Sequence, residues 1–253
     1  AGRIEIKDGF FSNAVASRDA TGVAGEVEIE DGSVSISQLT GHVDGGDFQV
    51  SGTYDLRASE QPACDLLWVI KDVPLMSWNG VALPLSGRIN AVGGKNAGRL
   101  SGELQIAPAR IGAGVFVQPK LCVKGSNPGR WPRFNQSLSR LAPNEHWEMD
   151  VGIKSANPMT IGSGSLASGV HAVLRLGGSA TQAALSGHIE LPALKVEVPS
   201  GVLFADRATL SLLPEFPDDP FLYVEASGII AGVEVKCIAW GPLSEGKWVL
   251  DSI

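Results

Sequence analysis

Apolar and polar residues alternate with period two along most of this chain, and this pattern constrains the fold more than any other feature. Residues 26–30 read Glu-Val-Glu-Ile-Glu, residues 33–37 read Ser-Val-Ser-Ile-Ser, and residues 208–212 read Ala-Thr-Leu-Ser-Leu. Such alternation places every second side chain on one face of a half-buried β-strand. Turn signals such as Asp31-Gly32 separate the runs. Counting the runs predicts an all-β fold of roughly 16 to 20 short strands.

One segment departs from the alternation. Phe134, Leu138 and Leu141 follow the i, i+4, i+7 spacing of a helix face. Pro143 suits a helix end. The spacing therefore predicts one short amphipathic helix near residues 132–142.

The predicted helix suggests a division of the chain. We expect a first β-segment at 1–125, a loop with the helix at 126–144, and a second β-segment at 145–253. The sequence leaves open whether the two β-segments share one continuous sheet.

A short phrase recurs within the predicted strands. Residues 85–89, 100–104 and 185–189 all read Leu-Ser-Gly-x-apolar, and residues 50–54 and 226–230 are looser copies. Repetition of one strand unit suggests a stack in which each unit covers its neighbours. The alternative is that Ser-Gly pairs are simply common in glycine-rich β-proteins, and the chain does contain 31 Gly.

The apolar face of so many strands has to be covered. One helix is too little cover, and a closed barrel or sandwich would use more large inward residues than the 6% aromatic content supplies. An elongated antiparallel sheet, curled lengthwise into a trough with an apolar inner groove, fits this composition. Strands spaced about 4.8 Å apart would give a body roughly 70–95 Å long.

Charge and cysteine content exclude several classes of function. A net charge of −7 opposes binding to nucleic acid. No run of about 18 apolar residues spans a membrane. Cys64, Cys122 and Cys237 lie far apart without CxxC spacing, so neither a disulfide framework nor a zinc site is predicted. Cys237 shares a strand face with Val235, which favours a small buried hydrophobe over the alternative of a reactive thiol.

No arrangement of residues predicts catalysis or a cofactor. The four His lie in separate elements without partners at metal-ligand spacing. Residues 44–47 resemble a calcium loop only superficially, and a turn is favoured. Residues 162–167 match G-x-G-x-x-A, but a strand follows where a dinucleotide site needs a helix. We therefore expect neither an enzyme nor a bound metal.

The C-terminal hundred residues resemble a known family. Residues 174–178 (Leu-Arg-Leu-Gly-Gly), 184–191 (Ala-Leu-Ser-Gly-His-Ile-Glu-Leu) and 233–244, which end in Gly-Pro-Leu-Ser, are similar to the conserved C-terminal region of TamB-type translocation and assembly proteins. That family belongs to the AsmA-like superfamily. Residues 29–36 and 45–52 resemble AsmA-like repeats more loosely.

The resemblance implies a function in the cell envelope of a diderm bacterium. It implies a periplasmic segment of a protein whose inner-membrane anchor lies outside this sequence. Members form a taco-like β-groove and are associated with phospholipid transport to the outer membrane. They are also linked to the assembly of outer-membrane proteins together with a barrel partner.

Two functions thus remain, with different candidate residues. The first is a lipid conduit, in which phospholipid acyl chains contact an alternating apolar face. Its predicted groove residues lie on successive strands: Val196, Val198, Leu210, Leu212, Leu222, Val224, Val233 and Val235. The second is an assembly module that pairs with a barrel partner or client strands through an edge strand containing Trp248 and Leu250. A closed β-sandwich with a scaffold role is a third alternative.

Overall fold

A computed structural model describes most of the chain. The described residues are 1–13, 18–57, 63–78, 81–94, 97–108, 110–111, 146–156, 159–163, 166–179, 182–198, 200–242 and 247–252. The helix predicted near residues 132–142, with its flanking loop, lies outside them. All regular elements of the described residues are β-strands. The all-β prediction is therefore confirmed.

The described residues form seventeen strands that belong to one sheet. Their bounds are β1 (Gly2–Asn13), β2 (Arg18–Glu30), β3 (Ser33–Val43), β4 (Gly46–Asp55), β5 (Cys64–Trp78), β6 (Val81–Gly93), β7 (Gly98–Ile106), β8 (Arg110–Ile111), β9 (Trp147–Ser155), β10 (Met159–Ser163), β11 (Leu166–Ser179), β12 (Ala184–Glu190), β13 (Lys195–Val198), β14 (Gly201–Leu213), β15 (Phe216–Ile230), β16 (Val233–Pro242) and β17 (Lys247–Ser252).

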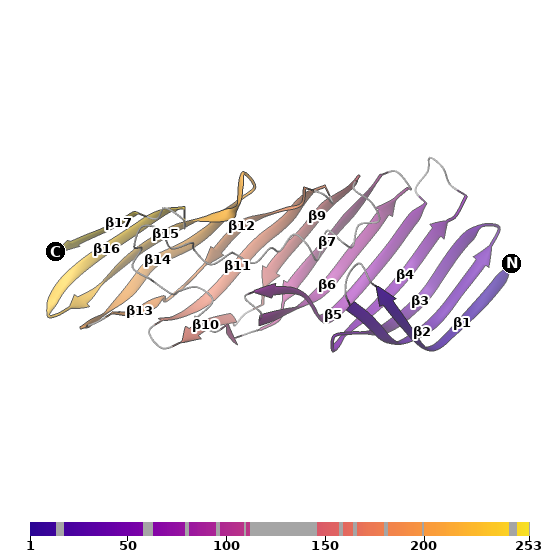
Figure 1. The fold of residues 1–253 in the computed structure, drawn as a ribbon, viewed down its shortest axis with the longest axis horizontal. Helices are drawn as coiled ribbons and strands as arrows, with labels where there is room; N and C mark the ends of the chain where they lie inside the picture. The colour runs from indigo at the N-terminus through magenta and orange to yellow at the C-terminus, as the bar shows by residue number, and fades with distance from the viewer. Residues whose placement is uncertain are drawn as a thin grey trace.

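The strands follow one another across the sheet almost in chain order. Antiparallel pairing runs from β1 through β7, and again from β9 through β11, β12, β14, β15 and β16 to β17. The short strand β13 extends the line of β12 and pairs with β14. The result is a long, narrow sheet with the two chain ends at its opposite extremes (Figure 1).

Two parallel pairs, β7 with β9 and the short β8 with β10, join the two β-segments into a continuous sheet. β7 and β9 run parallel, from Gly98 opposite Trp147 to Ile106 opposite Ser155. A parallel pair needs a longer connection than a hairpin, and residues 107–146 lie between these two strands. The change from antiparallel to parallel pairing thus occurs near the middle of the chain.

A cluster of charges crosses this parallel seam on the polar face. Asp150 on β9 accepts hydrogen bonds from Arg99 on β7 and from Arg175 on β11, the latter at 2.8 Å from Nε to Oδ1. The bonds from Arg99 and then Arg175 lower the pKa of the Asp150 carboxyl below its usual value. The carboxylate therefore links three neighbouring strands.

Replacing Asp150 with Asn should reduce the acid sensitivity of the fold. A carboxyl with a lowered folded-state pKa adds stability above its unfolded pKa of about 4, and this contribution is lost as pH falls through the folded value. We expect wild type to lose more unfolding free energy than Asp150→Asn between about pH 7 and about pH 3. Urea denaturation at both pH values measures this. Glu148→Gln, at an exposed site on the same strand, is the control, and equal losses in wild type and Asp150→Asn would contradict the role.

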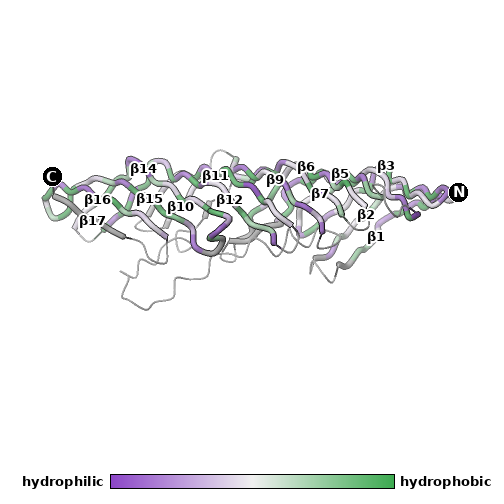
Figure 2. Tube along the Cα trace, turned by 90° about the horizontal axis from the view of Figure 1, so that it is seen from above, coloured by the Kyte–Doolittle hydropathy of each residue, from purple (hydrophilic) through white to green (hydrophobic). Residues whose placement is uncertain are grey.

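Hydropathy alternates along the strands, and the sheet is curled across its width (Figure 2). The alternation gives the sheet one apolar and one polar face. Alternation places Leu100, Leu104 and Ile106 of β7 in the core, while Glu103 between them is exposed. The buried side chains of β5 to β14 pack into one continuous cluster on the concave side. A smaller cluster of Leu203, Ala226, Val235 and Cys237 continues it towards the C-terminal end.

The repeated Ser-Gly phrase marks places where strands approach each other too closely for a side chain. A Cβ on the glycine of each of the five phrases would lie 2.0–2.2 Å from a carbonyl oxygen of the neighbouring strand. These glycines are Gly52, Gly87, Gly102, Gly187 and Gly228. Three of them, Gly52, Gly87 and Gly187, also have φ values of +132°, +151° and +123°, which L side chains rarely adopt. Glycine in a strand interior typically marks a tight bend or a close backbone approach. We therefore attribute part of the curl to these glycines.

Candidate functional site: the open section of the concave face

The middle of the concave face is a packed core. Leu85 on β6 and Ile153 on β9 are 0% exposed, and their inward neighbours on β7, β11 and β12 are similarly buried. No described strand forms a second layer over this sheet. The inward side chains of β5 to β14 accordingly contact one another.

The N-terminal end of the same face is only partly open, since Val23 on β2 and Val50 on β4 are buried while other inward residues are exposed. One row of residues that are paired from strand to strand runs from Ile4 through Val27 and Ile36 towards Ala91, Leu100 and Met149. Ile4 is 50% exposed, whereas Ala91, Leu100 and Met149 are 4–6% exposed. The buried fraction of the side chains thus rises along a single row of the same face, from the edge strand β1 towards the middle of the sheet.

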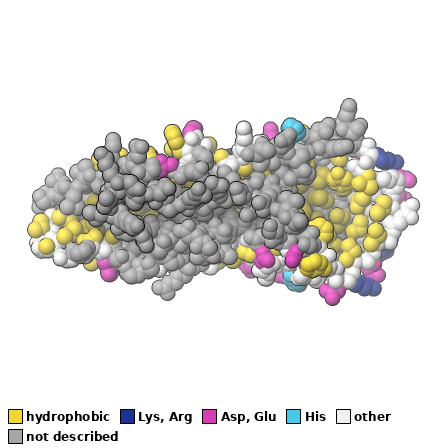
Figure 3. Space-filling model, viewed as in Figure 1, with side chains coloured by type: hydrophobic (Ala, Val, Ile, Leu, Met, Phe, Trp, Pro, Cys, Tyr) yellow, Lys and Arg dark blue, Asp and Glu magenta, His cyan; other side chains and the backbone are white. Residues whose placement is uncertain are grey.

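We call this exposed part of the concave face the open section. It lies on β1 to β4, and its members share the inward face and incomplete burial. They are Ile4, Phe11, Val27, Ile29, Val34, Ile36 and Tyr54. Tyr54 is 40% exposed and pairs with Val34. Figure 3 shows hydrophobic side chains gathered over this end of the molecule.

The groove residues predicted from the sequence lie nearer the C-terminal end of the sheet, and most of them are less exposed than the residues of the open section. Leu210, Leu212 and Val235 are buried, and Val233 is exposed at the strand end. The other four are half-buried: Val196, Val198, Leu222 and Val224. Val196 and Val224 pack against both clusters, and Leu222 against the larger one. The structure therefore brings most of them together, but as parts of the packed core.

The open section is not among the sites predicted from the sequence. The alternation at residues 26–30 and 33–37 predicts the strands and their inward residues. The sequence does not indicate that these inward residues stay exposed, because their exposure depends on which strands flank them.

The edge strand predicted for assembly is present as β17. It pairs with β16 through Trp248 opposite Ala239 and Leu250 opposite Cys237. Among the described strands, β17 has a neighbour on this side alone, as β1 has with β2. Both ends of the sheet thus present strand edges within the described residues.

Ion pairs occupy the convex face. Lys236 contacts Glu225 at 2.6 Å from Nζ to Oε1, which lowers the pKa of Glu225 and raises that of Lys236. Arg3 pairs with Glu26 near the N-terminal end, and this contact raises the pKa of Arg3. Charge is therefore concentrated on the face opposite the apolar one.

Cys64 and Cys237 are buried free thiols, and burial raises the pKa of both. We predict that they react slowly with iodoacetamide at neutral pH in the folded protein, because the thiolate is the reactive form. A Cys122→Ser background leaves only these two thiols. Alkylation followed by mass spectrometry should show little modification in buffer and complete modification in denaturant. Equal rates in both conditions would contradict the buried assignment.

No metal site is found in the described residues, where no three His, Cys, Asp or Glu side chains are grouped so that they could hold an ion. His42 contacts Asp47 and His171 contacts Glu190, in separate parts of the sheet. In the described part of the chain there is no helix long and apolar enough to cross a membrane.

The chain was also compared with known proteins. Models of known protein families give no match to it, and a search of curated proteins finds no similar sequence. The geometry of the sheet and the resemblance seen in the sequence remain as guides to the function.

Proposed function

We propose that the open section binds acyl chains of phospholipids and that this segment is part of a periplasmic conduit between the inner and outer membranes. The observation that supports this is the exposed apolar surface of the open section on the concave face, where Ile4 is 50% and Tyr54 is 40% exposed. Contiguous exposed apolar surface in a water-soluble fold typically marks a binding site. The resemblance to TamB-type proteins supports a location in the envelope of a diderm bacterium.

Acyl chains suit this surface because its contacts are apolar and non-directional. Each methylene removed from water contributes about 0.8 kcal/mol. Apart from the glycines, the described inward side chains of β1 to β4 are aliphatic or belong to the aromatic residues Phe11, Phe48 and Tyr54. Such a surface tolerates chains of different length and saturation.

The packed core limits where lipid sits in this conformation. Inward side chains of β5 to β14 already contact one another, so acyl chains bind at the open section. Passage of lipid along the rest of the trough requires these side chains to separate.

Native mass spectrometry with lipid extraction tests the proposal. The double variant Ile4→Gln, Tyr54→Gln makes the open section polar at exposed positions, where little stability should be lost. The control is Glu5→Gln, Thr53→Gln, which changes the neighbouring residues on the opposite face. We expect about a tenfold weaker retention of phospholipid in the first variant and no change in the control. A folded wild-type protein that takes up no phospholipid would contradict the proposal.

An observation at the C-terminal end favours a second candidate, an assembly module. Phe221 and Trp240 are exposed, and the register of Tyr223 opposite Trp240 places them on the convex face with Glu225 and Lys236. Trp and Tyr are enriched at the energetic centres of protein interfaces. An outer-membrane barrel protein is the partner that the resemblance implies. Loss of partner binding in Trp240→Ala, with lipid retention unchanged, would separate this function from the conduit.

A further inference from the structure

The negative charge of the protein is concentrated at the end that carries the open section. Residues 1–57 contain four basic and ten acidic residues, a net charge of −6, while the whole chain carries −7. These residues comprise β1 to β4 and their connections. The remainder of the chain is therefore close to neutral.

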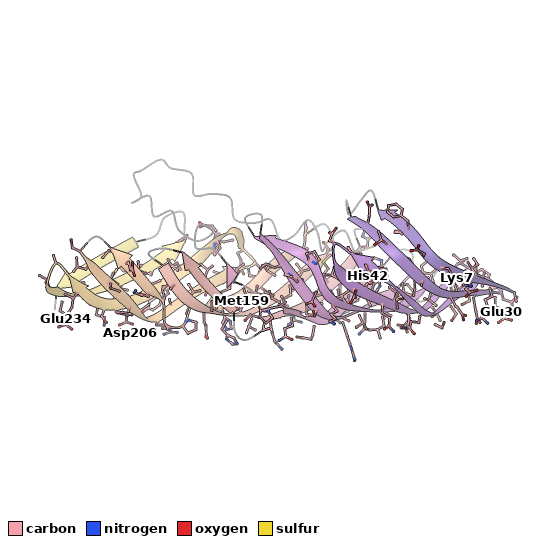
Figure 4. All side chains as sticks on the ribbon, turned by 90° about the horizontal axis from the view of Figure 1, so that it is seen from below. Lys7, Glu30, His42, Met159, Asp206 and Glu234 are labelled. Atoms are coloured by element: carbon pink, nitrogen blue, oxygen red, sulfur yellow. The ribbon has the colours of Figure 1, made fainter. Side chains whose placement is uncertain are left out.

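Most of these acidic residues lie where the strands end, along both margins of the open section. They belong to the ends of β2 and β4, the start of β4, and the turns beside β3: Asp19, Glu30, Asp31, Asp44, Asp47 and Asp55. Figure 4 shows Glu30 at this extreme of the sheet and Glu234 at the opposite one. Both margins are thus acidic.

The basic residues nearby offset part of this charge, and residues 1–57 keep a net charge of −6. Arg3 pairs with Glu26, and Lys7 pairs with Glu5 at 3.0 Å. The backbone N–H of Arg57 donates to Asp55, while Asp47 contacts His42 and lies opposite Lys71 of β5. An amphiphile whose chain lies on the concave face would hold its head group at a margin, within reach of these carboxylates.

We propose that the open section selects amphiphiles whose head group carries an ammonium over amphiphiles with an anionic head group. This inference rests on the proposed function, since it presumes that an acyl chain binds at the open section. Exposed charges act over about 8 Å at physiological ionic strength. An ammonium at the margin is attracted to the carboxylates there, whereas a net negative head group is repelled.

The probes are lysophosphatidylethanolamine, lysophosphatidylglycerol and an uncharged monoacylglycerol with the same acyl chain, each below its micelle concentration. Titration of the purified protein gives three dissociation constants. We expect the ethanolamine lipid to bind about fivefold or more tightly than the glycerol lipid, with the uncharged lipid between them. About 0.5 M salt should reduce this difference to less than about twofold.

A pair of charge-matched variants locates the effect. Glu30→Gln, Asp31→Asn removes two carboxylates beside the open section, and Asn tolerates the positive φ of Asp31 (47°). Glu215→Gln, Glu234→Gln removes two exposed carboxylates from the other end. We expect the first variant to lose most of the selectivity and the second to keep it. Equal binding of the two charged lipids to wild type would overturn this inference alone. No binding of any of the three lipids would overturn the proposed function as well.

Discussion

Replacing Gly87 with Ala should prevent stable folding or lower the unfolding free energy by about 4 kcal/mol or more. A Cβ at this position would lie 2.1 Å from the carbonyl oxygen of Glu103 on the neighbouring strand. Backbone atoms that are fixed by sheet pairing cannot move aside easily. The φ of +151° adds strain for any residue with a side chain. Chemical denaturation followed by circular dichroism measures the change.

Gly2→Ala is the matched control, because a Cβ there has nothing within 4 Å. We expect its unfolding free energy to stay within about 0.5 kcal/mol of wild type. Gly187→Ala, where the clash is with the carbonyl oxygen of Val173, should behave like Gly87→Ala. If Gly87→Ala were as stable as Gly2→Ala, the repeated glycines would not be required for the close approach of strands.

The second large effect is expected for Leu210→Asp, which should unfold the protein. Leu210 is 2% exposed within the larger cluster, so the substitution buries a carboxylate without a partner and removes apolar contacts. The cost exceeds that of a Leu→Ala change, which is itself about 2–5 kcal/mol. Thermal unfolding should show a much lower midpoint or no cooperative transition.

Ile4→Asp provides the comparison, because half of the Ile4 side chain is already exposed. Its unfolding free energy should fall by no more than about 1 kcal/mol. Loss of bound lipid in Leu210→Asp would therefore reflect unfolding, while loss in a folded Ile4→Asp would reflect the open section. Similar destabilisation by both substitutions would contradict the division into a packed core and an open section.

Period-two alternation was sufficient to predict the strands themselves. Residues 26–30 lie in β2, residues 33–37 in β3, and residues 208–212 in β14, with the apolar members facing inward in each case. Alternation is reliable here because a half-buried strand in a single sheet has to place its apolar residues on one side. The elongated, curled sheet followed from the shortage of covering elements.

Three features of the structure depend on strand pairing and side-chain packing and could not be predicted from the sequence. The Ser-Gly phrase was recognised as a repeat, but its cause is a carbonyl oxygen from another strand, such as that of Glu103 beside Gly87. The parallel pairing of β7 with β9 has no local signal in either strand. Exposure of Ile4 and burial of Leu100 on one row depend on flanking strands, so alternation alone could not locate the open section.

Photo-crosslinking from the open section tests the central claim most directly. A benzophenone amino acid placed at Tyr54 would point from the concave face, and one placed at Thr53 on the same strand would point from the convex face. Each protein is irradiated with bound phospholipid and analysed by mass spectrometry. Acyl-chain binding at the open section predicts a lipid adduct at position 54 and none at position 53. Equal labelling at both positions, or no adduct at position 54 in a protein that retains lipid, would contradict it.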